Sequence, residues 1–105
     1  MSELEQLQQL IESKKDSDPS LSYTAKLFAQ GIEEIQKKFG EESIELIIAS
    51  NQDNKKNVIN ETADVLYHLL VLLSEKSVSL KEVISELERR SGMSGLEEKA
   101  SRNKS

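Results

Sequence analysis

The chain has 105 residues, no cysteine and a formal net charge of -5 at pH 7. This length predicts one domain, residues 1–105, with a core small enough that a partner chain would help to cover it. The lack of cysteine excludes a disulfide framework and a thiolate metal site. The acidic balance and the lack of a basic, aromatic-rich face exclude a nucleic-acid binder. No apolar run approaches the ~20 residues that span a bilayer, and MSELEQLQQ is unlike a signal peptide, so we expect a cytoplasmic protein.

The spacing of the apolar residues predicts helices, because strand-like alternation is missing. A first helix carries one apolar stripe, made of Leu4, Leu7, Leu10 and Ile11. The segment DSDPS at residues 16–20 ends this helix, since Pro19 cannot continue it. A second helical region follows over residues 22–50, and we expect it to bend or split near Gly31 and Gly40.

Turn and cap signals divide the second half of the chain. The polar segment NQDNKKN predicts a turn, with Asp53 as the N-cap of a long helix that ends at about Lys76. Ser79 and Glu82 form the S-x-x-E capping box of a last helix, and residues 92–105 are expected to form a mobile tail. The chain is therefore predicted to be all-α, with four to five helices.

Carboxylates are set into helices that otherwise look buried. In NETADVLYHLLVLL, residues 60–73, the polar side chains of Glu61, Asp64 and His68 share one face, because they are spaced by three and four residues. Apolar residues occupy the rest of the circumference, which is typical of an interior helix. The segment GEESIELIIAS, residues 40–50, carries a similar acidic group, made of Glu41, Glu42 and Glu45.

The two acidic faces are expected to meet, since a short connection makes the two helices antiparallel neighbours. Four or five buried carboxylates cannot stay ionised without cations, because an unpaired buried charge is strongly unfavourable. Lys38 and His68 are too few to neutralise them. An all-oxygen ligand set favours Mg²⁺, with Mn²⁺ as the alternative. Because Mg²⁺ takes further ligands from substrate phosphates, the pattern predicts a polyphosphate substrate.

Other interpretations stay open on the residues alone. The glutamates of residues 40–50 could line a solvated helix face, and His68 could be a satisfied core or interface histidine. A di-iron bundle is disfavoured, because it requires Glu-x-x-His on two helices. Here the residue three positions after Glu61 is Asp64, and the chain has a single histidine.

The acidic signature resembles that of the all-α nucleotide pyrophosphohydrolases, the MazG-like superfamily. Its parts are E-E-x-x-E at residues 41–45 and E-x-x-D at residues 61–64. Within this superfamily the chain is most similar to the phosphoribosyl-ATP pyrophosphatase family of histidine biosynthesis. The segments that carry this similarity are SYTAKLFAQGIEEI, KKFGEESIE, ETADVLYHLLVLL and SGLEEKASR. The first 20 residues match only loosely.

The resemblance implies a MazG-like helical bundle completed by homodimerisation. It also implies Mg²⁺-dependent hydrolysis of 1-(5-phosphoribosyl)-ATP to 1-(5-phosphoribosyl)-AMP and pyrophosphate, the second step of L-histidine biosynthesis. Glu42, Glu45, Glu61 and Asp64 are expected to be catalytic metal ligands, and Glu41 to support a ligand or to orient or deprotonate water. The expected substrate-binding residues are Lys38, His68, Lys99, Arg102, Lys26, Tyr23 and Thr24.

Ser22 is expected to cap its helix and not to contact substrate. Two rival functions remain. A house-cleaning MazG-like pyrophosphatase for nucleoside triphosphates would share the acidic core but not the GLEEKASR segment. A non-catalytic helical dimerisation module would use its acids only to bind cations.

Overall fold

A computed structural model describes residues 2–91 of the chain. The expected C-terminal tail, with the predicted substrate-binding residues Lys99 and Arg102, lies outside the described residues. The regular structure of the described part is entirely helical, which confirms the all-α prediction. Its helices are α1 (Glu3–Ser13), α2 (Tyr23–Gln30), α3 (Ile32–Ser50), α4 (Lys55–Glu75) and α5 (Leu80–Arg90).

Except at α3, short polar side chains cap the helix N-termini by accepting backbone N–H groups of the first turn. Ser22 caps α2 in this way, as predicted. The capping box of Ser79 and Glu82 at the start of α5 is also confirmed. The prediction for α4 is wrong by one residue. Asn54, not Asp53, is the N-cap, because its extended backbone lets its side-chain oxygen accept an N–H of the first turn.

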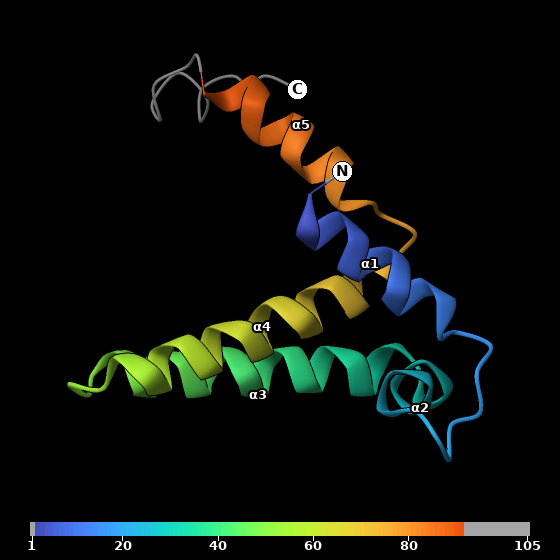
Figure 1. Ribbon diagram of the computed structural model, residues 1–105, viewed down its shortest axis with the longest axis horizontal. Helices are drawn as coiled ribbons and strands as arrows, with labels where there is room; N and C mark the ends of the chain where they lie inside the picture. The colour runs from blue at the N-terminus through green and yellow to red at the C-terminus, as the bar shows by residue number, and fades with distance from the viewer. Residues whose placement is uncertain (1, 92–105) are drawn as a thin grey trace.

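The split of the helical region near Gly31 is confirmed, whereas a split near Gly40 is wrong, because α3 continues through that residue. Gly31 has a φ of 95°, in the left-handed region that glycine adopts without a steric penalty. Gly40 lies inside α3, where a glycine costs roughly 1 kcal/mol relative to alanine, too little to end a long packed helix. The break lets α2 run across the end of α3 and not along it (Figure 1).

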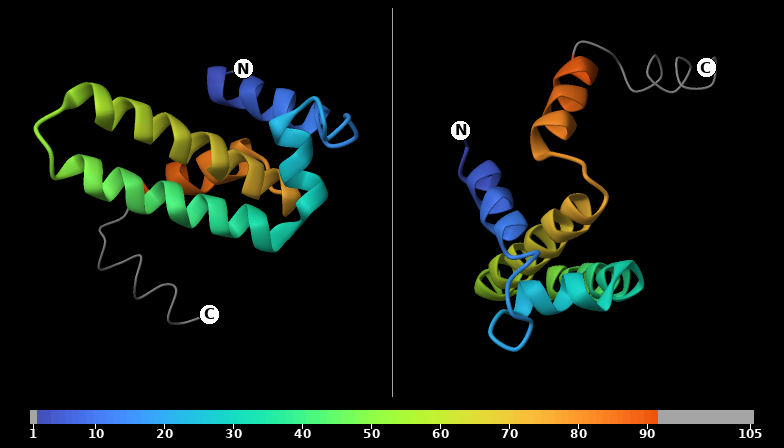
Figure 2. Two further views of the ribbon diagram at one scale, coloured as in Figure 1. Left: turned by 90° about the horizontal axis from the view of Figure 1, so that it is seen from below. Right: turned by 90° about the vertical axis from the view of Figure 1, so that its right-hand side faces the viewer.

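Helices α3 and α4 form a long antiparallel hairpin, and the core lies at one end of it (Figures 1 and 2). There α1 packs on the second half of α4, and α2 packs on both long helices. Helix α5 leads away from the hairpin and contacts α1. The buried apolar side chains of this end are Ile11, Leu27, Ile35, Leu70 and Val71.

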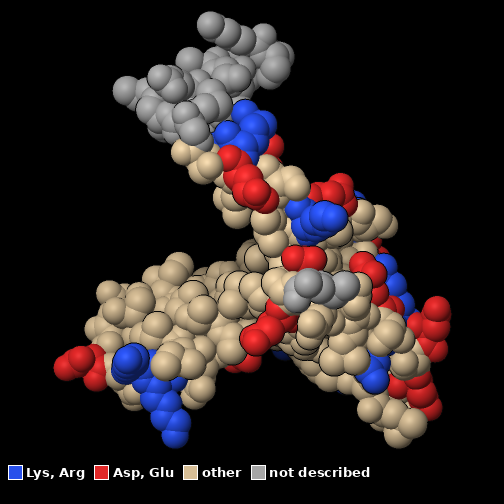
Figure 3. Space-filling view, turned by 45° about the horizontal axis from the view of Figure 1, so that its top comes forward, with Lys and Arg blue, Asp and Glu red and all other residues tan. Residues whose placement is uncertain are grey.

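The far end of the hairpin has no covering helix among the described residues. Helix α4, predicted to be buried all round, is buried at His68, Leu70 and Val71 but not in its first half. Figure 3 shows few charged side chains on the hairpin between its tip and α1. The large apolar side chains exposed on α3 and α4 are Ile44, Ile47, Ile48, Ile59 and Leu66. No helix within residues 2–91 has the length and apolar character needed to cross a bilayer.

Candidate active site

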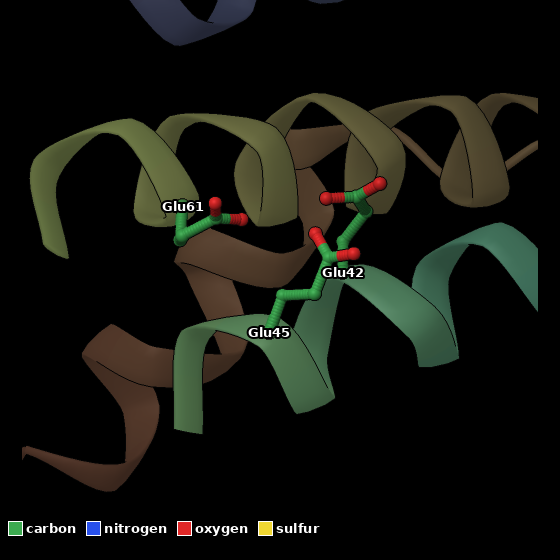
Figure 4. Close-up of side chains that lie close together, drawn as sticks. All are labelled: Glu42, Glu45 and Glu61. Carbon is green, nitrogen blue, oxygen red and sulfur yellow. The ribbon is translucent and has the colours of Figure 1, made fainter. Parts of the chain in front are cut away.

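Three carboxylates from two helices converge in the hairpin (Figure 4). Glu42 and Glu45 extend from α3 toward Glu61 of α4, and one oxygen of each lies within 4.8 Å of the other two. These three residues are called the acidic cluster below. Their convergence confirms, for these residues, that the two acidic faces meet.

Burial and mutual repulsion disfavour the ionised forms of two members of this cluster, Glu42 and Glu61. Burial raises the pKa of Glu42 above that of an ordinary carboxyl group, and the charge of Glu45 and a hydrogen bond with it raise that pKa further. Burial likewise raises the pKa of Glu61, and the charge of Glu45 and a hydrogen bond with it raise that pKa further. Protons therefore compete with cations for Glu42 and Glu61.

One oxygen of Glu61 is left without a partner. Its Oε2 is buried and makes no hydrogen bond to any described residue. Leaving a buried acceptor unsatisfied costs about 1–3 kcal/mol, and more when it is charged. A cation held among these oxygens would remove that cost, and an all-oxygen set is the kind that Mg²⁺ and Mn²⁺ prefer. The residues therefore fit a hard divalent cation.

Asp64, the fourth predicted metal ligand, lies at the edge of the acidic cluster. Its charge raises the pKa of both Glu61 and Glu42, so it is close to both. Its side chain is exposed, and it is not among the converging carboxylates. An aspartate is one methylene shorter than a glutamate and reaches less far between the helices. The structure thus gathers three of the four predicted ligands and places the fourth beside them.

Glu41 is also outside the acidic cluster. It forms ion pairs with Lys37, at 3.9 Å, and with Lys38, at 3.7 Å. These contacts hold the ammonium group of Lys38 near the site, where its charge lowers the pKa of Tyr23 against the larger, opposite effect of burial. The roles of Glu41 toward water and of Lys38 toward phosphate stay predictions.

His68 connects the acidic face of α4 to α2. Its side chain is 7% exposed, with Nδ1 2.7 Å from the carbonyl oxygen of Asp64 and Nε2 2.9 Å from the hydroxyl of Tyr23. A carbonyl oxygen only accepts, so Nδ1 carries the proton, and in the neutral ring Nε2 accepts from the Tyr23 hydroxyl. A positive charge on His68 would lower the pKa of Glu42. His68 is therefore a satisfied, nearly buried histidine that lies beside the acidic cluster.

The remaining predicted substrate-binding residues lie in different environments. Thr24 is buried, and its hydroxyl is hydrogen-bonded to the hydroxyl of Tyr67, which packs α2 on α4. Lys26 is exposed and lines a pocket together with Tyr23. The helical pattern of residues 60–73 does not predict the contact of the Tyr67 hydroxyl, because a tyrosine ring also fits an apolar helix surface. A tyrosine hydroxyl that is removed from water needs a hydrogen-bond partner. A tyrosine within an otherwise apolar helix therefore indicates that a polar group lies opposite it.

Comparison with known proteins shows to which family the chain belongs. The family described as phosphoribosyl-ATP pyrophosphohydrolase matches residues 4–91. The chain belongs to this family.

Curated members of the phosphoribosyl-ATP pyrophosphohydrolase family are similar over nearly their whole length. The chain is 51% identical over 102 residues to the phosphoribosyl-ATP pyrophosphatase of Rhodobacter capsulatus, covering 97% of this chain and 99% of that protein. The enzyme of the same name from Dinoroseobacter shibae is also 51% identical, with 97% and 100% covered. That of Paracoccus denitrificans is 50% identical over 99 residues, with 94% and 92% covered. The resemblance seen in the acidic signature is confirmed.

Proposed function

We propose that this protein hydrolyses 1-(5-phosphoribosyl)-ATP to 1-(5-phosphoribosyl)-AMP and pyrophosphate, the second step of L-histidine biosynthesis. The observation that carries the proposal is the convergence of Glu42, Glu45 and Glu61, together with a buried oxygen of Glu61 that has no hydrogen-bond partner within residues 2–91. It provides a site for a divalent cation of the kind that binds polyphosphates. Relatives that are about half identical in sequence share the name phosphoribosyl-ATP pyrophosphatase. This name is the reason to propose phosphoribosyl-ATP among the possible polyphosphate substrates.

In this proposal the acidic cluster would hold Mg²⁺, or Mn²⁺ in its place, with Asp64 completing the ligand set at its edge. When bound, the ion polarises the phosphoryl group and neutralises charge on the leaving pyrophosphate. Glu41, next along α3, would orient or deprotonate the attacking water. Lys38, which is ion-paired with Glu41, would contact a phosphate oxygen.

His68 has a positioning role in this mechanism. The imidazole is held by Asp64 and Tyr23 and lies where a positive charge affects Glu42. It would therefore balance the negative charge of the acidic cluster and phosphates without touching the reacting atoms. Lys99 and Arg102, which lie beyond the described range, would bind further phosphate oxygens of the substrate.

The second part of the proposal is a homodimer, acting as a single-domain enzyme in the cytoplasm. The exposed apolar side chains of α3 lie on the helix side opposite to Glu42, given a rotation of about 100° per residue. Those of α4, Ile59 and Leu66, lie opposite to Glu61 by the same geometry. The outer faces of the hairpin are thus apolar and uncovered in the single described chain. A second copy packed on these faces would complete a bundle, because exposed apolar patches of this kind mark association surfaces.

Pyrophosphate release tests the enzymatic proposal. Phosphoribosyl-ATP and a panel of nucleoside triphosphates would be compared at saturating Mg²⁺, and we expect kcat/KM to be highest for phosphoribosyl-ATP. Equal or faster release from the ordinary triphosphates would instead indicate a house-cleaning pyrophosphatase. No release from any nucleotide would indicate a non-catalytic module. Complementation of a histidine auxotroph that lacks this step would give an independent answer in cells.

A further inference from the structure

An open pocket of about 580 Å³ lies where the loop before α2 meets the first turn of that helix. It combines an aromatic ring, an ammonium group and two hydroxyl groups. We call it the Tyr23 pocket, and its lining residues are Pro19, Ser20, Leu21, Ser22, Tyr23 and Lys26. It lies outside the acidic cluster but is connected to it, because Tyr23 is hydrogen-bonded to His68, and His68 to Asp64.

The ring of Tyr23 is held in place although about half of it is in solvent. Its exposed fraction is 52%, yet its hydroxyl is fixed by Nε2 of His68 at 2.9 Å. The two rings pack edge to face, with centroids 5.9 Å apart and planes at 77°. The nearly buried His68 is itself fixed by Asp64. A ring ordered before binding loses little conformational entropy when a ligand packs on it, which suits it to a planar base.

Lys26 brings a positive charge to the same pocket. It is three residues after Tyr23, so the two side chains extend from one side of α2. It is exposed, and no ion pair joins it to another residue of the range 2–91. An ammonium group of this kind can bind a phosphate as a point charge.

We propose that the Tyr23 pocket binds the phosphoribosyl-adenine end of the substrate. The purine stacks on the ring of Tyr23, and Lys26 contacts the phosphate farthest from the reacting anhydride. This inference rests on the proposed function, because phosphoribosyl-ATP carries its base between two phosphate-bearing groups. The acidic cluster at one end and an ammonium group at the other match that order of groups.

The test separates the base from the outer phosphate by using two ligands. KM is measured for phosphoribosyl-ATP, and the affinity of ATP, which lacks the outer phosphate, is measured by calorimetry. Tyr23→Leu should weaken both ligands by about 10-fold or more, because stacking on an aromatic side chain is worth ~1–3 kcal/mol per base. Tyr23→Phe should keep most of this binding. Lys26→Met should raise KM for phosphoribosyl-ATP by about 10-fold and leave ATP binding unchanged.

A matched variant and a spectroscopic readout complete the experiment. Lys81→Met removes an ammonium group that is also exposed, on α5, and should change the binding of neither ligand. If Tyr23→Leu does not fold, NMR of the wild-type protein decides the same point. The ring resonances of Tyr23 should shift on adding ATP, and those of Tyr67 should shift less.

Two results would overturn the inference. One is unchanged ATP affinity in Tyr23→Leu, and the other is an equal effect of Lys26→Met on ATP and phosphoribosyl-ATP. Failure of the proposed function looks different, since the wild-type protein would then release no pyrophosphate from phosphoribosyl-ATP. The ATP binding measurements would still decide whether Tyr23 stacks a base.

Discussion

Nε2 of Gln8 donates a hydrogen bond to the carbonyl oxygen of Val78 at a distance of 2.9 Å. Oε1 of the same side chain accepts the N–H of Leu80 at 2.7 Å, and Gln8 is only 5% exposed. A single buried amide therefore joins α1 to the turn between α4 and α5. It satisfies one backbone acceptor and one backbone donor that water does not reach easily.

Gln8→Leu should destabilise the fold by about 2–3 kcal/mol, because it leaves these two backbone groups without partners. Urea denaturation measures the change in the free energy of unfolding. Gln9→Leu is the matched control, since the neighbouring Gln9 is exposed, and its effect should stay within ~0.5 kcal/mol. Equal effects of the two variants would mean that the amide of Gln8 contributes little.

Glu61→Gln should reduce kcat for pyrophosphate release by more than about 100-fold. Removing a residue that only supports a metal ligand already lowers activity, and removing the ligand itself should lower it further. Asp64→Asn is expected to behave in the same way. Glu75→Gln, on the same helix but outside the acidic cluster, should retain activity. Circular dichroism and sedimentation would show that the fold and the association state are kept. Full activity in Glu61→Gln would exclude this carboxylate as a ligand.

Without divalent ions, the acidic cluster should make the protein less stable as the pH rises. The pKa values of Glu42 and Glu61 are raised from 4.5, so just above this value the folded chain binds more protons than the unfolded chain. The stability contributed by these two groups is present below the ordinary carboxyl pKa and is lost as the pH rises through the raised values. The Tm in EDTA should thus fall less steeply with pH in Glu61→Gln than in the wild type. Parallel curves would argue against this shift.

Mg²⁺ should reverse that loss. A ligand at 100 times its Kd, bound only by the folded state, adds about 2.7 kcal/mol to the free energy of unfolding. Thermal unfolding should therefore show a rise in Tm for the wild type on adding Mg²⁺, and little or no rise for Glu61→Gln. A rise of the same size in both proteins would mean that the ion binds elsewhere.

Ile47→Asp should separate the proposed dimer. Ile47 is 61% exposed on the outer side of α3, so a carboxylate there is tolerated in a single chain but would be desolvated at the interface. Sedimentation velocity should show a monomer for this variant. Leu87→Asp, on the 58% exposed Leu87 of α5, is the control and should leave the association state unchanged. A dimeric Ile47→Asp protein would exclude this face of α3 from the interface.

Local patterns in the sequence were enough to predict the helices and the meeting of the two acidic faces. The capping signals at Ser22 and at Ser79 with Glu82 involve residues three apart, so they do not depend on the rest of the fold. The same holds for the side of each helix on which Glu42 and Glu61 project. A helix repeats every 3.6 residues wherever it lies. A short connection between two long helices makes them pack side by side as antiparallel neighbours.

Only the tertiary structure decided which polar groups lost water. Glu61 and Asp64 share one helical face, yet one has a buried, unsatisfied oxygen and the other is exposed. Gln8 looked like one of several polar residues of α1 until its packing against the α4–α5 turn was known. The helical period predicts the direction in which a side chain projects from the helix axis. Whether that side chain loses contact with water depends on how close the neighbouring helices are and on where they end. That information lies in contacts between residues far apart in the sequence.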